Sequence, residues 1–365
     1  MKVAILVGLF PPKRLAGTEI ATYYMAGHLA QRGHEVHVIT SLDEGLPEES
    51  YEQGFYIHRL PRIRNRFASA FVFCIDIVRA IRKINPEIIH VQSFCIAIPA
   101  LISKKFYKIP YVLWGQGSDV YLPDPLTKMT SKITMQNADS MIALTEDMKQ
   151  AMQSIYYRDV AVVPNGIEFK EYMSEAPVNM IKGSEKRILF VGRLYPVKGV
   201  QYLLQAMKII HEEMPDVKLI LVGDGEEREH LESLTDSLEI RERVEFAGRV
   251  LHKKVQDYMN QADVLVLPSL SEGFPLTILE AMACGLPIVA TRVRGVPDIV
   301  ENDTNGYLVD TKDPEQIAWA LLKILENEQL RKNISKNNRE KVKTYSWDKV
   351  VVQLERIYQK TLQTS

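Results

Sequence analysis

The chain has 365 residues, with 45 Lys and Arg against 46 Asp and Glu and a hydrophobic content of 46%. At roughly 150 residues per domain, this length predicts about two domains, each large enough to bury a core without disulfides or metal. The near-zero net charge argues against a nucleic-acid-binding protein, which normally carries a marked basic excess. The cysteines stand at no metal-ligand or disulfide-framework spacing, so we expect no metal site and a reducing, cytoplasmic location.

The first half alternates short runs of β-branched residues with longer segments of helical period. This alternation indicates parallel βαβ units. The N-terminal run meets two prolines and a basic pair, so we interpret it as a buried strand and not as a signal peptide, and no apolar run is long enough to span a membrane. The predicted strands are residues 3–9, 36–40, 56–60, 88–91, 111–114, 141–144 and 160–163, and the predicted helices are 19–31 and 68–83.

A boundary between two α/β domains is expected near residue 170. There a strand ends in a turn at Pro164-Asn165-Gly166, and the segment 171–186 has no periodicity. The second half repeats the alternation up to Asp313 and then becomes helical, with a last amphipathic stretch from Trp347. Its predicted strands are residues 187–191, 218–222, 244–246, 264–267 and 287–290, and its predicted helices include 200–213 and 226–238.

Ligands of doubly wound sheets bind beyond the carboxyl ends of the strands, so the loops that follow strands are the candidate sites. The first such loop, residues 11–19, contains Gly17 just before a helix. It has one glycine and is not a dinucleotide-binding GxGxxG loop. A plain turn capped by Thr18 is the simpler alternative.

Two loops of the second half carry charged residues whose arrangement indicates a ligand-binding site. Arg193 and Lys198 lie between two glycines after a strand, where a guanidinium fork and an ammonium can converge on a diphosphate. Further on, Glu272 lies in a loop and Glu280 in an apolar helix that we expect to start near Pro275 and to end at a glycine. An acid among apolar neighbours needs a partner or a ligand, and a carboxylate suits the hydroxyls of a ribose.

These residues resemble a known family. Glu272-Gly273-Phe274-Pro275, followed by Glu280 eight positions after Glu272, is similar to the Glu-x7-Glu motif of the retaining, nucleotide-sugar-dependent glycosyltransferases of group 1 or family 4. Residues 192–199, 163–166 and the proline-rich first loop match the same family in the same order. The resemblance covers the whole chain and implies a GT-B fold, in which two Rossmann-like α/β domains face a cleft.

The resemblance also implies the domains and the donor site. Residues 1–170 would bind the acceptor, 171–345 would bind the nucleotide-sugar donor, and the helix in 346–365 would pack back on the first domain. The residues implied to carry catalysis are Glu272, Arg193 and Lys198: the two cations would hold the donor diphosphate, and Glu272 would bind the transferred sugar. The further donor contacts implied are Glu280 on the ribose, backbone amides of Gly273, Phe274, Pro275, Leu276 and Thr277, Gly17 from the first domain, and Arg249 and Val250 at the base.

In this family the leaving phosphate takes the acceptor proton during front-face attack, which retains the anomeric configuration without a protein nucleophile. No metal or other cofactor is expected. One departure stands out: where members commonly have His-Gly-x-Asp, this chain has Gln116, with Asp119 retained. Glutamine can hydrogen-bond a sugar but cannot act as an acid or base. His90 is a further candidate contact to the sugar or acceptor, although a lone histidine in a strand is more often structural.

A basic and apolar segment of the first domain suggests where an acceptor is met. Residues 59–83 hold seven Arg or Lys and one acid, and they combine a basic loop with an apolar helix. Such a segment could touch anionic lipid headgroups, which would suit a peripheral membrane protein with a lipid-linked acceptor. The alternative is a core helix after a solvated loop, with a glycan or small-molecule acceptor.

Two other functions stay open. A GT-B-fold nucleotide-sugar epimerase would need acid and base side chains around the sugar, which Gln116 disfavours. A non-catalytic nucleotide-sugar-binding module is disfavoured by the presence of Arg193, Lys198, Glu272 and Glu280. The base, the sugar and the acceptor are all left open by these residues.

Overall fold

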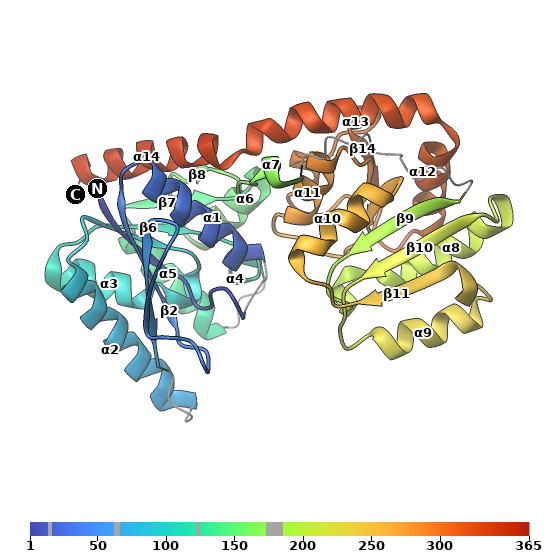
Figure 1. Ribbon diagram of the computed structural model, residues 1–365. Helices are drawn as coiled ribbons and strands as arrows, with labels where there is room; N and C mark the ends of the chain where they lie inside the picture. The colour runs from blue at the N-terminus through green and yellow to red at the C-terminus, as the bar shows by residue number, and fades with distance from the viewer. Residues whose placement is uncertain (14–16, 62–65, 122–124, 173–184, 365) are drawn as a thin grey trace. The chain divides into compact units, whose positions relative to one another are not determined.

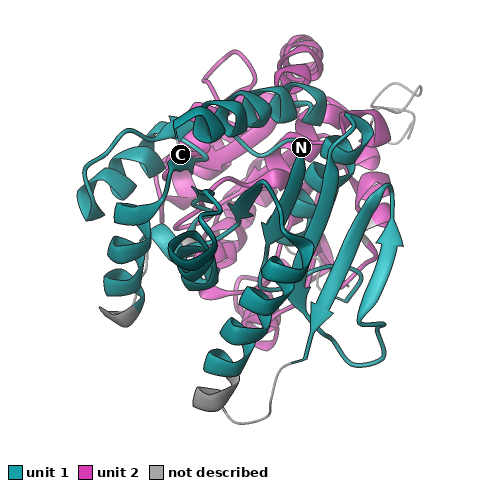
Figure 2. Ribbon diagram, turned by 90° about the vertical axis from the view of Figure 1, so that its left-hand side faces the viewer, with its two compact units in different colours: residues 1–166, 346–365 teal, residues 167–345 magenta. Residues whose placement is uncertain are grey.

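Two mainly parallel sheets organise the chain (Figure 1). The computed structural model describes residues 1–13, 17–61, 66–121, 125–172 and 185–364. The chain divides into unit 1, residues 1–166 with 346–365, and unit 2, residues 167–345 (Figure 2). The crossing between Gly166 and Ile167 lies close to the expected boundary near residue 170, and the C-terminal segment belongs to unit 1.

Unit 1 is built on a sheet that has eight strands among the described residues. Their order is β3-β4-β2-β1-β5-β6-β7-β8, and all neighbours are parallel except β3 and β4. Each strand predicted in this half is present, although the first ends three residues earlier than expected. The bounds are β1 Lys2–Leu6, β2 Glu35–Ser41, β3 Glu49–Glu52, β4 Phe55–Leu60, β5 Ile88–Val91, β6 Tyr111–Trp114, β7 Ser140–Ala143 and β8 Ala161–Val162.

Helices cover both faces of this sheet. The connection from β1 to β2 runs along the sheet in the opposite direction to the connections after β4, so right-handed crossovers place α1 on one face and α2, α3, α5 and α6 on the other. Helix α14 packs beside α1, where Arg32 Nε donates to Glu355 Oε1 at 2.7 Å. The bounds are α1 Gly17–Gln31, α2 Arg66–Ile84, η1 Phe94–Ile96, α3 Ile98–Tyr107, α4 Ser118–Tyr121, α5 Pro125–Asn137, α6 Glu146–Ile155 and α14 Trp347–Thr364.

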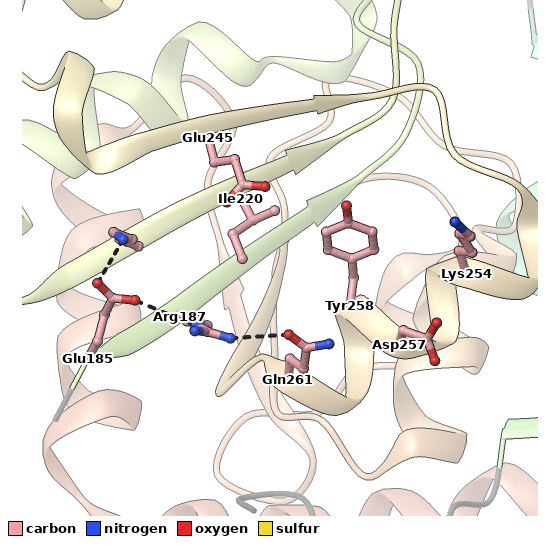
Figure 3. Close-up of a pocket in the computed structure, with 9 residues that line it drawn as sticks. Glu185, Arg187, Ile220, Glu245, Lys254, Asp257, Tyr258 and Gln261 are labelled. Atoms are coloured by element: carbon pink, nitrogen blue, oxygen red, sulfur yellow. Dashed lines mark hydrogen bonds and ion pairs between the residues drawn. The ribbon is translucent and has the colours of Figure 1, made fainter. Parts of the chain in front are cut away.

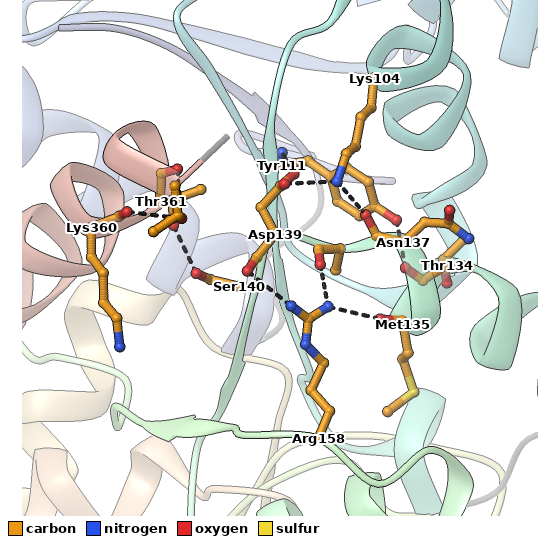
Figure 4. Close-up of polar contacts among 12 residues, drawn as sticks. Lys104, Tyr111, Thr134, Met135, Asn137, Asp139, Ser140, Arg158, Lys360 and Thr361 are labelled. Atoms are coloured by element: carbon orange, nitrogen blue, oxygen red, sulfur yellow. Dashed lines mark hydrogen bonds and ion pairs between the residues drawn. The ribbon is translucent and has the colours of Figure 1, made fainter.

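A polar cluster at the amino ends of β6 and β7 ties these layers together (Figure 4). Asp139 accepts hydrogen bonds from Lys104 Nζ of α3 at 2.6 Å and from the backbone N–H of Tyr111 at 2.9 Å. On the other face, the Ser140 and Thr361 hydroxyls lie 2.7 Å apart, which joins β7 to α14. Asp139 and Ser140 therefore connect the sheet to helices on both of its faces.

Unit 2 is built on an entirely parallel sheet that has six strands in the described part of the chain. Their order is β11-β10-β9-β12-β13-β14, so the strand order reverses beside β9 as in other doubly wound folds. The bounds are β9 Lys186–Val191, β10 Val217–Val222, β11 Val244–Gly248, β12 Val264–Leu267, β13 Ile288–Thr291 and β14 Gly306–Val309. All five strands predicted in this half are present, and β14 is additional.

The helices of unit 2 alternate with these strands, and α12 and α13 follow the last strand. The predicted helices 200–213 and 226–238 correspond to α8 and α9. The bounds are α7 Phe169–Tyr172, η2 Pro196–Lys198, α8 Val200–Glu213, α9 Arg228–Ser237, η3 Arg241–Arg243, α10 His252–Gln261, α11 Leu276–Cys284, η4 Val296–Asp298, α12 Pro314–Glu326, α13 Glu328–Val342 and η5 Lys343–Tyr345. Among the described residues, none of the helices combines the length and apolarity that crossing a bilayer demands.

Candidate active site

The two charged loops of unit 2 meet at the carboxyl edge of its sheet. Strands β9 and β12 are neighbours, so the loops that follow them lie side by side, and Leu270 N donates to Val197 O at 2.7 Å. Lys198 Nζ lies 2.6 Å from Glu272 Oε1, and the Ser269 hydroxyl donates to the same oxygen at 2.6 Å. Two residues that lie 74 positions apart in the sequence thus form one ion pair.

Glycines allow these loops to pack so closely. Gly199 has a φ of +62°, and a Cβ there would lie 2.2 Å from the carbonyl oxygen of Pro268. Gly223 and Gly225, in the loop after β10, would place a Cβ 1.8 Å from Gly192 O and 2.3 Å from Leu194 O. The loop after β10 is therefore part of the same edge. This loop was not among the predicted site loops, although two glycines two residues apart after a strand indicate close backbone approach.

Arg193 remains available for an anion. Its side chain is exposed, its guanidinium lies 4.8 Å from the centre of the Tyr195 ring, and it forms no ion pair within the described residues. The Lys198 and Glu272 side chains are more enclosed, with exposed fractions of 21% and 10%. The edge therefore presents the exposed Arg193 beside a half-buried, pre-formed ion pair.

Glu280 has the partner that its apolar surroundings call for. It lies in α11 with 8% of its surface exposed, and the Tyr172 hydroxyl of α7 donates to its Oε1 at 3.2 Å. One turn further along α11, burial raises the pKa of the Cys284 thiol to about 12, and the charge of Glu280 adds to this effect. The thiol is thus a neutral packing group that donates to the Tyr172 carbonyl at 3.6 Å.

The start of α11 supplies backbone donors at the same edge. Pro275 is the residue that precedes the helix, and Gly285 ends it with a φ of +78°, as the sequence predicted. Ile278 N donates to Pro275 O at 3.0 Å, which leaves the N–H groups of Leu276 and Thr277 at the positive end of the helix dipole. The predicted amide donors among residues 273–277 lie in the chain between Glu272 and Glu280, and Pro275 has no N–H to contribute.

The remaining residue pair predicted in unit 2 lies further along the edge. Arg249 and Val250 follow β11, which is separated from β9 by β10, and Arg249 is exposed. Gly248, just before them, turns the chain with a φ of +72°. The sheet therefore brings Arg193, Lys198, Glu272 and the α11 start together and leaves Arg249 and Val250 two strands away.

A cavity of about 440 Å³ in unit 2 lies elsewhere (Figure 3). Arg187, Lys218 and Glu245 line it from the amino-terminal ends of β9, β10 and β11, and Tyr258 and Gln261 line it from α10. The charged groups include as many acids as bases, and Arg187 is already paired with Gln261 at 3.2 Å. This cavity is distinct from the loops at the carboxyl edge.

In unit 1, Gln116 belongs to a chain of three amides. Its Nε2 donates to Gln92 Oε1 at 2.5 Å, and Asn165 Nδ2 donates to its Oε1 at 3.4 Å. Gln92 is fully buried and Asn165 is 3% exposed, with an Oδ1 that is buried without a partner in the described part of unit 1. Gln92 follows β5 directly but belongs to no motif in the sequence, so it was not predicted as a site residue.

The other two candidates of unit 1 have environments that favour structural roles. Asp119 is 7% exposed, and its carboxylate accepts hydrogen bonds from the backbone N–H groups of Phe94, Gln116 and Gly117 at 2.9–3.2 Å. His90 is fully buried, and its Nδ1 lies 2.7 Å from the Tyr358 hydroxyl of α14. Burial lowers the pKa of His90 to about 3, so its ring is neutral near pH 7.

Gly17 is the exposed first residue of α1. Residues 14–16 before it lie outside the described part of the chain. The donor contact of Gly17 stays a prediction.

Comparison with known proteins decides the family. The sequence model described as "Glycosyl transferases group 1" matches residues 174–341, and the one described as "Glycosyltransferase Family 4" matches residues 15–171. An uncharacterised glycosyltransferase of Methanocaldococcus jannaschii is 30% identical over 98% of this chain and 98% of its own length. The chain belongs to the group 1 and family 4 glycosyltransferases.

Other relatives of this group 1 glycosyltransferase agree. The N-acetyl-alpha-D-glucosaminyl L-malate synthase of Bacillus anthracis is 29% identical over 98% of this chain and 97% of its own. The structure of sucrose-phosphate synthase from Thermosynechococcus elongatus superimposes with a TM-score of 0.87 at 23% identity, over 100% of both chains. The Anabaena protein HepE in complex with UDP-glucose gives 0.81 at 19%, again over 100% of both chains. The family and the GT-B fold that the motifs predicted are confirmed.

Proposed function

We propose that this glycosyltransferase is a retaining enzyme that moves a sugar from a nucleoside-diphosphate sugar to a hydroxyl acceptor. The observation that carries the proposal is the arrangement at one sheet edge of Arg193, the Lys198–Glu272 pair and the start of α11. Glycosyl transfer from such a donor develops negative charge on the departing diphosphate, and stabilising that charge is the largest help a protein can give. Arg193, Lys198 and the N-terminus of α11 would provide this stabilisation.

The two residues of the Lys198–Glu272 pair would act on the two groups that the breaking bond joins, the diphosphate and the transferred sugar. Without a donor, each side chain neutralises the other in a half-buried place. With a donor bound, Lys198 would turn to the diphosphate as a point charge, and Glu272 would accept hydrogen bonds from hydroxyls of the transferred sugar. Arg193 would bind the diphosphate as a fork.

Glu280 is proposed to bind the ribose. The Tyr172 hydroxyl of α7 donates to this carboxylate on α11. The carboxylate would therefore present oxygens in fixed positions to the ribose hydroxyls. Backbone N–H groups of Gly273, Phe274, Leu276 and Thr277 would hold sugar and phosphate, with Arg249 and Val250 near the base. The HepE complex contains UDP-glucose, which supports a nucleotide sugar as the donor class.

The acceptor is proposed to meet unit 1, where Gln116 would donate or accept a hydrogen bond at a sugar or acceptor hydroxyl. The relative named as a glucosaminyl malate synthase supports an acceptor class that includes small molecules. No side-chain nucleophile is needed if the leaving phosphate accepts the acceptor's proton. The proposal includes no metal, because Arg193 and Lys198 supply the counter-charge.

Thermal-shift titrations of the purified chain with UDP, GDP and ADP test the diphosphate assignment, since a bound ligand raises the melting temperature by mass action. We expect one of these nucleotides to stabilise the wild type. Arg193→Ala combined with Lys198→Ala should weaken its affinity by about 100-fold or more, because two charge-assisted contacts are lost. A matched control is Lys208→Ala combined with Lys336→Ala, two exposed lysines of α8 and α13. Equal shifts for both double variants would refute the diphosphate assignment.

Turnover tests the reaction. Nucleoside diphosphate should be released from the matching sugar donor only when an acceptor is present, with retained configuration in the product and no loss of rate in EDTA. Isomerisation of the donor sugar without an acceptor would indicate an epimerase instead, and binding without turnover of any donor and acceptor pair would indicate a binding module.

A further inference from the structure

Three helices of unit 1 form one continuous outer layer. Helices α2, α3 and α5 all lie on the same face of the sheet, α2 packs against α3, and α3 packs against α5. Figure 1 shows α2 and α3 side by side at the edge of unit 1. Their outward sides together make a surface that we call the α2–α3–α5 surface, formed by the described side chains of residues 70–84, 98–108 and 127–137.

This surface has a strongly unequal charge. It carries a single acid, Asp76, whose carboxylate is already 3.1 Å from Arg79. Neither α3 nor α5 contains an acid. The whole chain has a net charge of −1, so this concentration of cations is local. The cations are Arg79, Arg82, Lys83, Lys104, Lys105, Lys108, Lys128 and Lys132.

Four of these eight cations have contacts within the fold. Arg79 lies 3.1 Å from Asp76, and the Arg82 guanidinium lies 5.6 Å from the centre of the Tyr107 ring. Lys104 is bound to Asp139 at 2.6 Å, and Lys83 lies 3.8 Å from Glu49. The remaining lysines are exposed and form no ion pair with any described residue; they are Lys105, Lys108, Lys128 and Lys132. Because these four lysines form no ion pair with any described residue, their charges are available to a binding partner.

Large apolar side chains are interleaved with the lysines and exposed to solvent. In α5, Met129 and Ile133 alternate with Lys128 and Lys132 at a spacing of four residues, which puts both kinds on one side of the helix. In α3, the aromatic pair at positions 106 and 107 lies between two lysines. The exposed fractions are 70% for Phe71, 69% for Phe106, 56% for Met129, 41% for Ile133 and 37% for Tyr107.

We propose that the α2–α3–α5 surface docks unit 1 on an anionic lipid bilayer. Cations would meet the headgroup phosphates, and the apolar side chains between them would enter the boundary between headgroups and acyl chains. Charge alone would suit any polyanion. The exposed Met129 and Ile133 favour a bilayer over a nucleic acid, because aliphatic side chains do not stack on bases as aromatic ones do and gain free energy on entering an apolar phase. This inference is independent of the donor site, and it would place a transferase at lipid-linked acceptors.

The structure changes which residues form this surface. The sequence analysis placed it in residues 59–83. Arg59 is only 3% exposed and donates to the Ser50 hydroxyl at 2.8 Å, so it belongs to the interior, and that part of the prediction is wrong. Residues 62–65 and the side chains of residues 66–69 lie outside the described part of the chain. The contributions of α3 and α5 come from the fold, which sets them beside α2.

The test is co-sedimentation of the full chain with vesicles, one set of phosphatidylglycerol and phosphatidylcholine in equal parts and one of phosphatidylcholine alone. We expect binding to the anionic vesicles at low ionic strength and loss of binding at high salt. Each cation near such a membrane contributes about fivefold to the partition coefficient, so Lys105→Gln combined with Lys132→Gln should weaken binding by about 25-fold. Phe106→Ser should weaken it separately.

The matched control is Lys208→Gln combined with Lys336→Gln, which changes the net charge equally on exposed helices of unit 2. The control should bind like the wild type. Absence of sedimentation with the anionic vesicles, or equal loss in the control and in the surface variant, overturns the proposal. A soluble polyphosphate that binds the wild type as tightly as the vesicles, with no effect of Phe106→Ser, overturns it in favour of a general polyanion site. Vesicle binding needs no nucleotide, so these outcomes are separate from those of the donor assay.

Discussion

At the scale of single residues, the central feature is the shared role of Lys198 and Glu272. Their side chains lie 2.6 Å apart, and the Ser269 hydroxyl donates to the same carboxylate oxygen of Glu272 at 2.6 Å. A donor that binds Lys198 must therefore compete with Glu272. The same carboxylate is the proposed acceptor for sugar hydroxyls, so one side chain would oppose binding of the bare nucleotide and promote transfer from the complete donor.

Glu272→Gln separates these two effects. The amide keeps the shape but removes the charge that holds Lys198, so nucleoside diphosphate should bind as well as before or up to about fivefold tighter. Turnover should fall about 10- to 100-fold, because a hydrogen bond to a charged acceptor is lost in the transition state. Calorimetric titration and a turnover assay on the same preparation measure both. Weaker diphosphate binding would contradict the competition between Glu272 and the ligand.

What the sequence could predict at this scale depends on the distance between partners. Arg193, Lys198 and Glu272 form the part of the carboxyl edge that we call the donor edge, after its proposed ligand. They could be singled out from the sequence because they lie in loops that follow strands. The partner of Glu280 was expected but not identified, since Tyr172 lies 108 positions away in a four-residue helix. The chain of Gln92, Gln116 and Asn165 was missed for the same reason: it joins the ends of three separate segments, and no local pattern marks it.

At the scale of elements, buried strands were easier to predict than exposed ones. Strands β6 and β12 are apolar runs with every residue buried, and their predicted bounds agree with the structure. Strand β3 was missed because Glu49–Glu52 is polar and mostly exposed, and it pairs only as a hairpin at the sheet edge. Strand β14 was missed because it starts at a glycine, a residue that is unfavourable in strands; here a Cβ would meet Ile288 O at 2.3 Å.

The loop packing at the carboxyl edge can be tested with Gly199→Ala. A left-handed conformation costs a non-glycine residue about 1–2 kcal/mol, and the new Cβ would also lie 2.2 Å from Pro268 O, so the loop must move. We expect a lower free energy of unfolding and weaker nucleotide binding, because Lys198 is the preceding residue. Gly45→Ala is the matched control: Gly45 has a φ of +79° with no atom within 4 Å of an added Cβ. Denaturant unfolding of both variants isolates the clash, and equal losses would show that close packing at Gly199 has no cost.

At the scale of the whole molecule, the C-terminal helix makes unit 1 discontinuous in sequence. Residues 346–364 return after all of unit 2 and contribute buried side chains to unit 1. Trp347 is the first of them, and its ring packs so closely on Gly166 that a Cβ there would lie 2.4 Å from Trp347 Cδ2. The buried set is Trp347, Val350, Val351, Leu354, Tyr358 and Thr361. Unit 1 can therefore complete its core only after the last residues of the chain are in place.

Trp347→Ala tests this dependence. Removal of a fully buried indole from unit 1 should cost about 3–5 kcal/mol, while Arg193, Lys198 and Glu272, which all belong to unit 2, should keep their nucleotide affinity below the melting temperature. Trp319→Ala in α12 is the control: that indole is 56% exposed, so its loss should change stability by no more than about 0.5 kcal/mol. Calorimetric melting with and without the bound nucleotide separates the units, because the ligand stabilises only the part that binds it. A Trp347→Ala protein that loses nucleotide binding while still folded would show that the donor edge depends on unit 1, contrary to its assignment to unit 2 alone.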